Sequence, residues 1–412
     1  NTIPIINAII FMKFKDKDLT LWVMRILFLF LMSITSCFAQ ELDSGYIEKP
    51  IPKNQIKSIL GYYSQDGNHS AVTGGEGTEE LVVKSSRIIF IHKTDSNNRW
   101  IIKSGLDQIT SASTDQINYI ESSASYVDHR SQLNIGFDKV DSSRVYGFNI
   151  GTSIESDYWS RVIGFKYQQK LKKDVKLKLS LSYYWDDLRW GWVNSGQWKG
   201  DRLIYPVELR GTKWLDKSHR NSFNFSSSFN WISSKRSRMG IKLDLVFQEG
   251  ILSTPFHRIY FSDGSKGIEK FPSMRFKIPV GFSFNYMLTS HLIIKNYTRL
   301  YWDSFGLLSG TYKVQLPVKI KNWLWVKPFI RGYVQNGVDF FQPHSEHSIS
   351  NDYFTSDYDL SRMSSLSYGI DLKFKKKVTW RNFKESELKV EKFTRSDGLS
   401  FWQFVFFTEF KF

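Results

Sequence analysis

Apolar and polar residues alternate one by one along much of the chain, and this period of two limits its fold more than any other feature. Because successive side chains of a β-strand point to opposite faces, such a segment has one apolar and one polar face. The clearest example sets Val175, Leu177, Leu179, Leu181, Tyr183 and Trp185 against Lys176, Lys178, Ser180, Ser182, Tyr184 and Asp186. The same split recurs in residues 239–248 and 366–375. The chain is therefore predicted to be all-β, with strands that separate an apolar medium from a polar one.

Strand length, aromatic placement and the carboxyl end favour a transmembrane antiparallel β-barrel over a soluble β-sandwich. Many alternating segments keep their pattern for about 12 or more residues, which suffices to cross a bilayer when tilted, whereas soluble strands are usually shorter. Tyrosines and tryptophans gather near segment ends, as in Tyr158-Trp159, where the interfacial girdles of barrels lie. No run of 18 apolar residues offers a helical span. The chain stops on the alternating series Phe404, Phe406, Phe410 and Phe412, which looks like the sorting signal that barrel-assembly machinery reads.

The amino-terminal region has the composition of an export signal. Arg25 precedes the apolar run 26–32, and Ala39 is a small residue before a cleavage point ahead of Gln40. We expect residues 1–39 to be untranslated flank plus signal peptide, 40–54 a short periplasmic lead-in, and 55–412 a single barrel in the bacterial outer membrane. An alternative interpretation makes Cys37, the only cysteine, a lipidated residue. Under the first interpretation the mature protein has no thiol chemistry.

The number of strands follows from where the long loops fall. Starting at about Leu81 gives 14 strands and puts most long loops on the periplasmic side, opposite to known barrels. Adding strands at about 55–65 and 384–395 gives 16 and makes the periplasmic turns short, including those near Lys173 and 377–383. Long extracellular loops are then expected near 66–78, 111–124, 187–218, 250–271 and 339–360. The prediction is a 16-stranded barrel of a Gram-negative envelope, with 14 strands as the alternative.

The chain is strongly basic, with 56 Lys and Arg against 40 Asp and Glu, a net charge of +16. In an exported protein this favours lipopolysaccharide or an anionic solute as partner over nucleic acid. The polar strand faces should line a lumen, which in a barrel of this size is wide enough for water. The predicted lumen-lining residues are Lys176, Lys178, Lys242, Asp244, Lys295, Arg299, Asp303, Lys327, Arg331, Asp371 and Lys373. They either attract anions to an open path or form a neutralised network that fills the barrel.

Two loop clusters are candidates for chemistry beyond passage. In the first, Asp66, His69 and Glu76 accompany glycines that could cradle an anion or let the loop fold into the lumen. The second cluster offers zinc or copper ligands, and aspartates that suit calcium, at a spacing that matches no strong motif. Its residues are His344, Glu346 and His347, followed by Asp352, Asp357 and Asp359. Both segments can equally be ordinary polar loops.

Catalytic motifs are missing from the sequence. Neither a Gly-x-Ser-x-Gly elbow nor a His-Glu-x-x-His helix occurs, so we predict no enzyme and no cofactor. A barrel-embedded hydrolase that uses His69, His129 or His257 is kept as an alternative.

A family resemblance rests on three segments, residues 62–75 (YYSQDGNHSAVTGG), 254–261 (TPFHRIYF) and 301–306 (YWDSFG). They resemble an uncharacterised outer-membrane family, the domain of unknown function 3570, and the resemblance covers nearly the whole mature chain. It implies a barrel and an outer-membrane location, but it brings no established activity and no catalytic residues. It also suggests exported redox and flavin-transferring proteins as partners, beside outer-membrane lipid, lipopolysaccharide and the barrel-assembly machinery.

The function expected from these features is a porin-like channel for small, possibly anionic solutes. The alternative is a plugged structural or assembly partner in an envelope complex, linked to an exported redox or flavin pathway.

Overall fold

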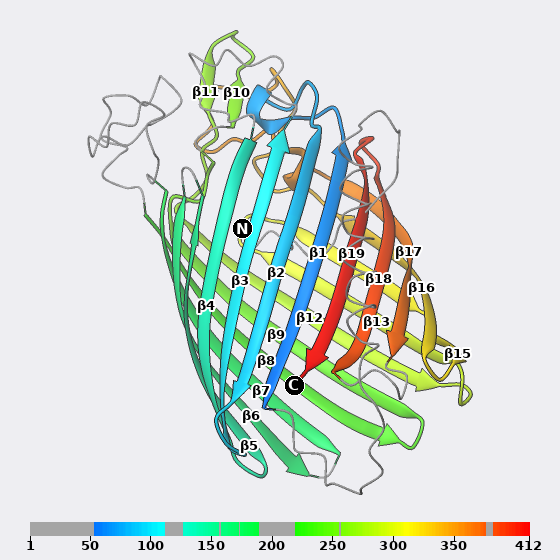
Figure 1. Ribbon diagram of the computed structural model, residues 1–412. Coiled ribbons are helices and arrows are strands. Elements are labelled where there is room, and N and C mark those ends of the chain that lie inside the picture. The colour runs from blue at the N-terminus through cyan, green and yellow to red at the C-terminus, as the bar shows by residue number, and fades with distance from the viewer. Residues whose placement is uncertain are drawn as a thin grey trace, which may run out of the picture.

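The computed structural model describes residues 53–111, 127–155, 158–172, 174–188, 219–254, 257–375 and 382–412. Within them the chain forms one large closed β-barrel with a small hairpin and two short 3-10 helices at one end (Figure 1). No helix in this part of the chain has the length and apolar character needed to cross a membrane. The predicted signal peptide, Cys37 and most of the lead-in lie outside the described residues.

The barrel wall consists of antiparallel neighbours in chain order. Its strands are β1 (Asn54–Asp66), β2 (Leu81–Lys93), β3 (Asn98–Ser111), β4 (Val127–Val140), β5 (Arg144–Ile154), β6 (Trp159–Lys172), β7 (Val175–Asp187), β8 (His219–Ser234), β9 (Ser237–Gly250), β12 (Met274–Met287), β13 (Ile293–Asp303), β14 (Leu308–Gln315), β15 (Val318–Lys321), β16 (Leu324–Gln335), β17 (Met363–Lys375), β18 (Phe383–Arg395) and β19 (Ser400–Lys411). The hairpin β10 (Arg258–Tyr260) and β11 (Lys266–Ile268) stands apart from the wall.

Sixteen strand positions make up the ring, as the sequence predicts, and the alternative of 14 is wrong. Strands β14 and β15 are two pieces of one position, because both pair with β16 and only Leu316 and Pro317 separate them. Proline has no N–H to donate to the ladder, which explains the interruption. The ring closes where β1 pairs with β19, from Gln55 opposite Lys411 to Asp66 opposite Ser400. A closed ring leaves no unpaired edge in the wall.

The two faces of the wall are reversed relative to a soluble protein. On β3 the outward side chains Trp100, Ile102 and Leu106 are large, apolar and exposed, whereas the inward Asp107 is buried. The strand β7 shows the same split, with Tyr183 and Trp185 exposed and Asp186 buried. Apolar groups on the outside and polar groups on the inside are the arrangement that a hydrocarbon environment stabilises.

The two ends of the barrel differ in the length of their connections. At the end that carries the C-terminus, the described turns are short, at 94–97, 141–143, 235–236, 288–292 and 322–323 (Figure 1). The opposite end carries the long segments 67–80, 251–273 and 336–362, together with the hairpin β10–β11. The predicted loops at 111–124 and 187–218 and the turn at 173 lie almost entirely outside the described residues, as does most of the predicted turn at 377–383. The long segments that the structure describes all lie at one mouth of the barrel.

On the closing strand Phe404, Phe406 and Phe410 lie on the face opposite to Phe401 and Phe407, which line the interior cavity, and Phe410 stacks on Phe412 with ring centroids 6.5 Å apart. We expect replacement of Phe410 and Phe412 by serine to reduce the amount of protein that reaches the outer membrane, because the assembly machinery would lose its aromatic signal. Quantitative blotting of outer-membrane fractions measures this. The matched control replaces Phe223 and Phe247, two outward phenylalanines that face each other across β8 and β9. Equal losses in both double variants would contradict a sorting role.

Candidate functional site: the barrel lumen and its loop cap

Buried carboxylates in the lumen are held by basic side chains of neighbouring strands. Asp138, which is 1% exposed, accepts hydrogen bonds from Arg99 at 2.7 Å and from Lys166 at 2.9 Å. Lys166 lies two strands away, and it reaches Asp138 across Gly147 on the strand between them. A Cβ at Gly147 would lie 2.4 Å from Cε of Lys166 and 2.5 Å from Oδ1 of Asp138. The glycine therefore makes room for this ion pair.

Asp303 is the centre of a second network at the loop end of the barrel. Its carboxylate is fully buried and accepts from Nε of Arg275 at 3.0 Å, from the hydroxyl of Tyr301 at 2.6 Å and from the backbone N–H of Phe305 at 2.9 Å. A buried carboxylate needs such donors because removal from water costs several kcal/mol. The network fixes the tight turn between β13 and β14.

Several residues that the sequence assigns to the lumen take part in ion pairs. Lys327 binds Glu387 and lies 3.9 Å from Asp371, which also accepts from Gln315 at 2.6 Å. Three further predicted lumen residues have carboxylates nearby: Lys373 lies 2.7 Å from Glu385, Arg331 lies 3.9 Å from Glu391, and Lys242 lies 2.7 Å from Asp244. A large share of the lumen charge is therefore neutralised within the wall.

Other predicted lumen residues keep their charge unpaired. Within the part of the chain that the structure describes, Lys176, Lys178, Lys295 and Arg299 have no carboxylate within ion-pair distance. Glutamates of β18 were not predicted as partners of these lysines and arginines, although the alternation of Glu387, Lys389 and Glu391 places them on the inner face. The carboxylates of the lumen are therefore largely paired, whereas some of its basic side chains are not.

A cavity of about 1160 Å³ lies inside the barrel. Basic side chains on its wall include Arg87, Lys103, Arg299 and Arg331, of which Arg87 is paired with Asp107 at 3.4 Å. The same cavity has an apolar strip on β19 and β1, made by Val405, Phe407 and Ile59, while Val83 and Ile89 of β2 lie on either side of Ser85 and Arg87. Sites for small molecules combine apolar surface with a few placed polar groups, and this wall has both.

The long segments 67–80, 251–273 and 336–362 form what we call the loop cap. The cap packs on the turn between β13 and β14: Phe305 and Leu307 of that turn and Val338 of the cap are buried against Phe271, Phe340 and Phe341. The rings of Phe305 and Phe340 have centroids 5.2 Å apart and meet edge to face. Asp359 of the cap lines the cavity and pairs with Arg395 of β18. The cap therefore forms part of the cavity wall at the mouth of the barrel.

The two loop clusters that the sequence singles out meet within this cap. His69 stacks on Tyr358 at 3.8 Å between ring centroids, and Glu76 lies 3.8 Å from Nδ1 of His344. Asp66 is exposed at the end of β1, and Glu346 is exposed as well. His347 is fully buried, and burial lowers the pKa of its imidazole. The neutral ring can then donate from Nε2 to the carbonyl oxygen of Thr355, 3.0 Å away.

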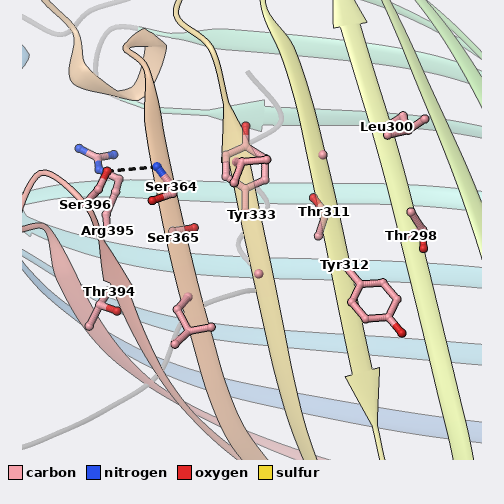
Figure 2. Close-up of a pocket in the computed structure, with 14 residues that line it drawn as sticks. Thr298, Leu300, Thr311, Tyr312, Tyr333, Ser364, Ser365, Thr394, Arg395 and Ser396 are labelled. Atoms are coloured by element: carbon pink, nitrogen blue, oxygen red, sulfur yellow. Dashed lines mark hydrogen bonds between the residues drawn. The ribbon is translucent and has the colours of Figure 1, made fainter.

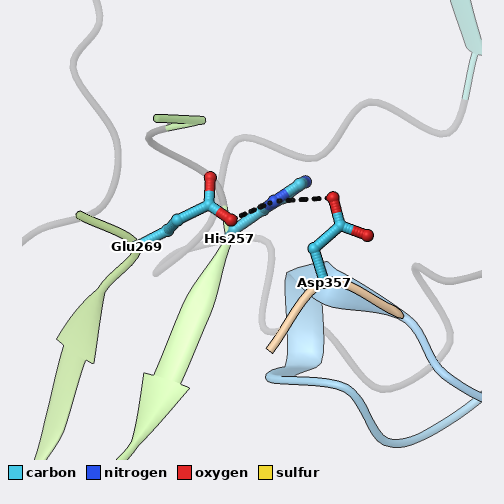
Figure 3. Close-up of side chains that lie close together, drawn as sticks. All are labelled: His257, Glu269 and Asp357. Carbon is cyan, nitrogen blue, oxygen red and sulfur yellow. Dashed lines mark hydrogen bonds and ion pairs between the residues drawn. The ribbon is translucent and has the colours of Figure 1, made fainter. Parts of the chain in front are cut away.

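A different group of possible ligands converges in the cap, as Figure 3 shows. Nδ1 of His257 lies 3.3 Å from Oε1 of Glu269 and 3.9 Å from Oδ2 of Asp357. Among the described residues, this is the group of three metal-ligating side chains whose donor atoms lie within 4.8 Å of one another. His257 and Asp357 were predicted as members of two different sites, and Glu269 was not predicted as a site residue. The three residues come from two loops about a hundred positions apart, which no local motif reveals.

Burial and mutual charge shift the pKa values of this group. Burial opposes protonation of His257, but attraction by Glu269, a hydrogen bond to it and the nearby Asp357 outweigh burial and raise the pKa of His257 to about 9. Burial and the charge of Asp359 raise the pKa of Asp357 to about 7. Both shifts favour the protonated forms of the imidazole and of the Asp357 carboxyl group.

A separate depression of about 660 Å³ lies in the wall where β13, β14, β16, β17 and β18 run side by side (Figure 2). It borders the outward and exposed side chains Leu300, Tyr312, Val334 and Leu366. Gly332 leaves open space here, because a Cβ added to it would meet no atom within 4 Å. The depression faces the apolar surroundings of the barrel and is distinct from the lumen.

Comparison with known proteins gives one family and several similar barrels. The model of a family described as "Protein of unknown function (DUF3570)" matches residues 53–399, and no curated protein matches. Among solved structures, a "Bacterial polysaccharide outer membrane secretin" is 9% identical with a TM-score of 0.46, covering 88% of this chain and 99% of that chain. OccAB4 of Acinetobacter baumannii is 8% identical with a TM-score of 0.41, covering 89% and 100%. OprD of Pseudomonas aeruginosa is 5% identical with a TM-score of 0.41, covering 90% and 96%.

Proposed function

This chain belongs to the family described as "Protein of unknown function (DUF3570)", and from the geometry of its barrel we propose that it is an outer-membrane pore for small organic anions. The observation that carries the proposal is the cavity inside the barrel, whose wall combines Lys103, Arg299 and Arg331 with an apolar strip. An anionic group can approach the basic side chains while an apolar group lies on the strip. We propose no catalytic role.

The orientation in the membrane follows the usual arrangement of such barrels. Outer-membrane barrels have short periplasmic turns and longer extracellular loops. We therefore assign the end with the C-terminus to the periplasm and the loop cap to the cell surface, where it would meet lipopolysaccharide and incoming solutes. The outward apolar side chains, such as Ile88 and Phe165, would contact the lipid.

Anion preference rests on the basic groups that have no acidic partner. Lys295 and Arg299 lie on the inner face of β13, in register with Gln315 and Thr311 of β14 rather than with acids. Charges in a water-filled lumen with walls of low dielectric constant focus their field on passing ions. A paired residue such as Lys327 contributes less to this field, because Glu387 compensates its charge.

A second candidate function is that of a plugged barrel that serves an envelope complex, for example one linked to an exported redox or flavin pathway. The loop cap favours it, because Phe305, Leu307 and Val338 are almost fully buried at the mouth. A cap that is packed in this way on the turn between β13 and β14 would keep the mouth of the barrel closed. The two candidates differ in one measurable respect, the passage of solute.

Solute flux into liposomes tests the proposed function. We expect barrels reconstituted in liposomes to admit benzenesulfonate faster than benzyltrimethylammonium, since the two probes carry similar apolar groups but permanent charges of opposite sign. Protein-free liposomes give the background. Equal rates for the two ions would contradict anion preference, and background rates for both would support the plugged barrel instead.

A further inference from the structure

We propose that His257, Glu269 and Asp357 form a binding site for a divalent transition metal ion such as zinc, which ties the two long loops of the cap together (Figure 3). His257 and Glu269 belong to the segment 251–273, and Asp357 belongs to the segment 336–362. The site is independent of solute passage, so it stands or falls separately from the proposed pore.

The donor atoms have spacings that suit one small ion. In a tetrahedral zinc site with bonds of about 2.0–2.2 Å, neighbouring ligand atoms lie about 3.3–3.6 Å apart. Here the nitrogen of His257 lies 3.3 Å from the oxygen of Glu269 and 3.9 Å from that of Asp357, and all three atoms lie within 4.8 Å of one another. A modest inward movement of Asp357 brings the three donors around one ion.

Hydrogen bonds already hold the two carboxylates in position. Glu269 accepts from the hydroxyl of Thr355 at 2.6 Å through Oε1 and from the backbone N–H of Thr254 at 2.8 Å through Oε2. Oδ1 of Asp357 accepts from the backbone N–H of Asp359 at 2.9 Å, which leaves Oδ2 directed towards His257. Such outer contacts orient the ligands of protein metal sites and raise their affinity.

The charge around the site favours a cation. Glu269, Asp357 and Asp359 surround the single imidazole of His257, while Arg395 neutralises Asp359 from the barrel side. A metal ion can be held by His257 only through an unprotonated ring nitrogen, so binding should weaken at acidic pH.

The ligand atoms, and the exposed sides of the side chains that carry them, indicate which ion the site suits. An imidazole nitrogen with two carboxylate oxygens suits zinc or a similar transition metal, whereas calcium takes oxygen ligands only. Glu269 is 1% exposed, but His257 and Asp357 are 20% and 23% exposed. Their exposed sides leave room for water to complete the coordination.

Titration calorimetry of the folded barrel in detergent with zinc chloride tests the proposal. We expect one zinc ion to bind per barrel at pH 7.5. His257→Gln and Asp357→Asn should each weaken binding by about tenfold or more. The asparagine keeps a side-chain oxygen that can accept the hydrogen bond from the backbone N–H of Asp359, so we expect this variant to fold. Millimolar calcium should not compete.

His344→Gln is the matched control, because it removes a cap histidine outside the proposed site. It should bind zinc as the parent protein does. The proposal is overturned if the parent binds no zinc, or if His344→Gln weakens binding while His257→Gln does not. The last result would place the ion at His344, Glu346 and His347 instead.

Discussion

Replacing Ile88 with arginine is expected to destabilise the barrel in a lipid bilayer by about 2–4 kcal/mol, the cost of a cationic side chain near the bilayer midplane. Ile88 lies near the middle of β2, points outward and is 52% exposed. Its neighbours across the ladder are Ser58 and Ser104, neither of which can pair with a cation. Reversible unfolding by denaturant in phospholipid vesicles measures the loss.

The adjacent variant Ile89→Arg is a matched control with the same residue types on the opposite face. Ile89 lines the cavity, where water can solvate the guanidinium, so we expect a loss of less than about 1 kcal/mol. The nearby Lys57 and Lys103 repel the new charge, but lumen water and salt screen this repulsion. Equal losses in the two variants would mean that the assignment of faces is wrong.

Reversing the two unpaired basic groups of β13, by Lys295→Glu with Arg299→Glu, is expected to shift the ion selectivity of the pore towards cations. The double change replaces two positive charges with two negative charges on the inner wall. Their field acts on any ion in the lumen, because low-dielectric walls confine it. Reversal potentials across a salt gradient in planar bilayers measure the shift.

The control for this experiment is the double variant Lys235→Glu with Arg236→Glu. Both residues are exposed in the short turn between β8 and β9. The double variant therefore reverses the same amount of charge, but at a place away from the cavity. Its effect should be small and should fade in about 1 M salt, where the screening length is roughly 3 Å. If both double variants shift selectivity equally, Lys295 and Arg299 do not line the path.

The architecture could be predicted because it depends on patterns that are local in the chain. In β7 apolar residues occupy every second position from Val175 to Trp185. Because a strand has a strict period of two, they all lie on one face and the residues between them lie on the other. The number of strands needed a second argument, the asymmetry of the loops, which recovered β1 and β18. The split of one strand position at Pro317 was not predicted, because the alternation continues on both sides of it.

The ion pairs and the cap cluster could not be predicted, because they depend on which strands and loops meet. Asp138 binds Lys166 two strands away only because Gly147 lies between them. His257, Glu269 and Asp357 meet only when two loops fold against each other, and neither loop contains more than part of the set. Sequence reasoning found the histidines at 344 and 347, whose spacing is visible, but the structure places His347 in a packed interior instead.

Single-channel recording of the parent protein in planar bilayers tests the central claim, a water-filled lumen that prefers anions. We expect stable conductance steps and a reversal potential of the sign expected for anions across a potassium chloride gradient. The preference should weaken as salt rises, because screening shortens the reach of Lys295 and Arg299. A bilayer that stays silent with correctly folded protein, or a pore that prefers cations, would contradict it.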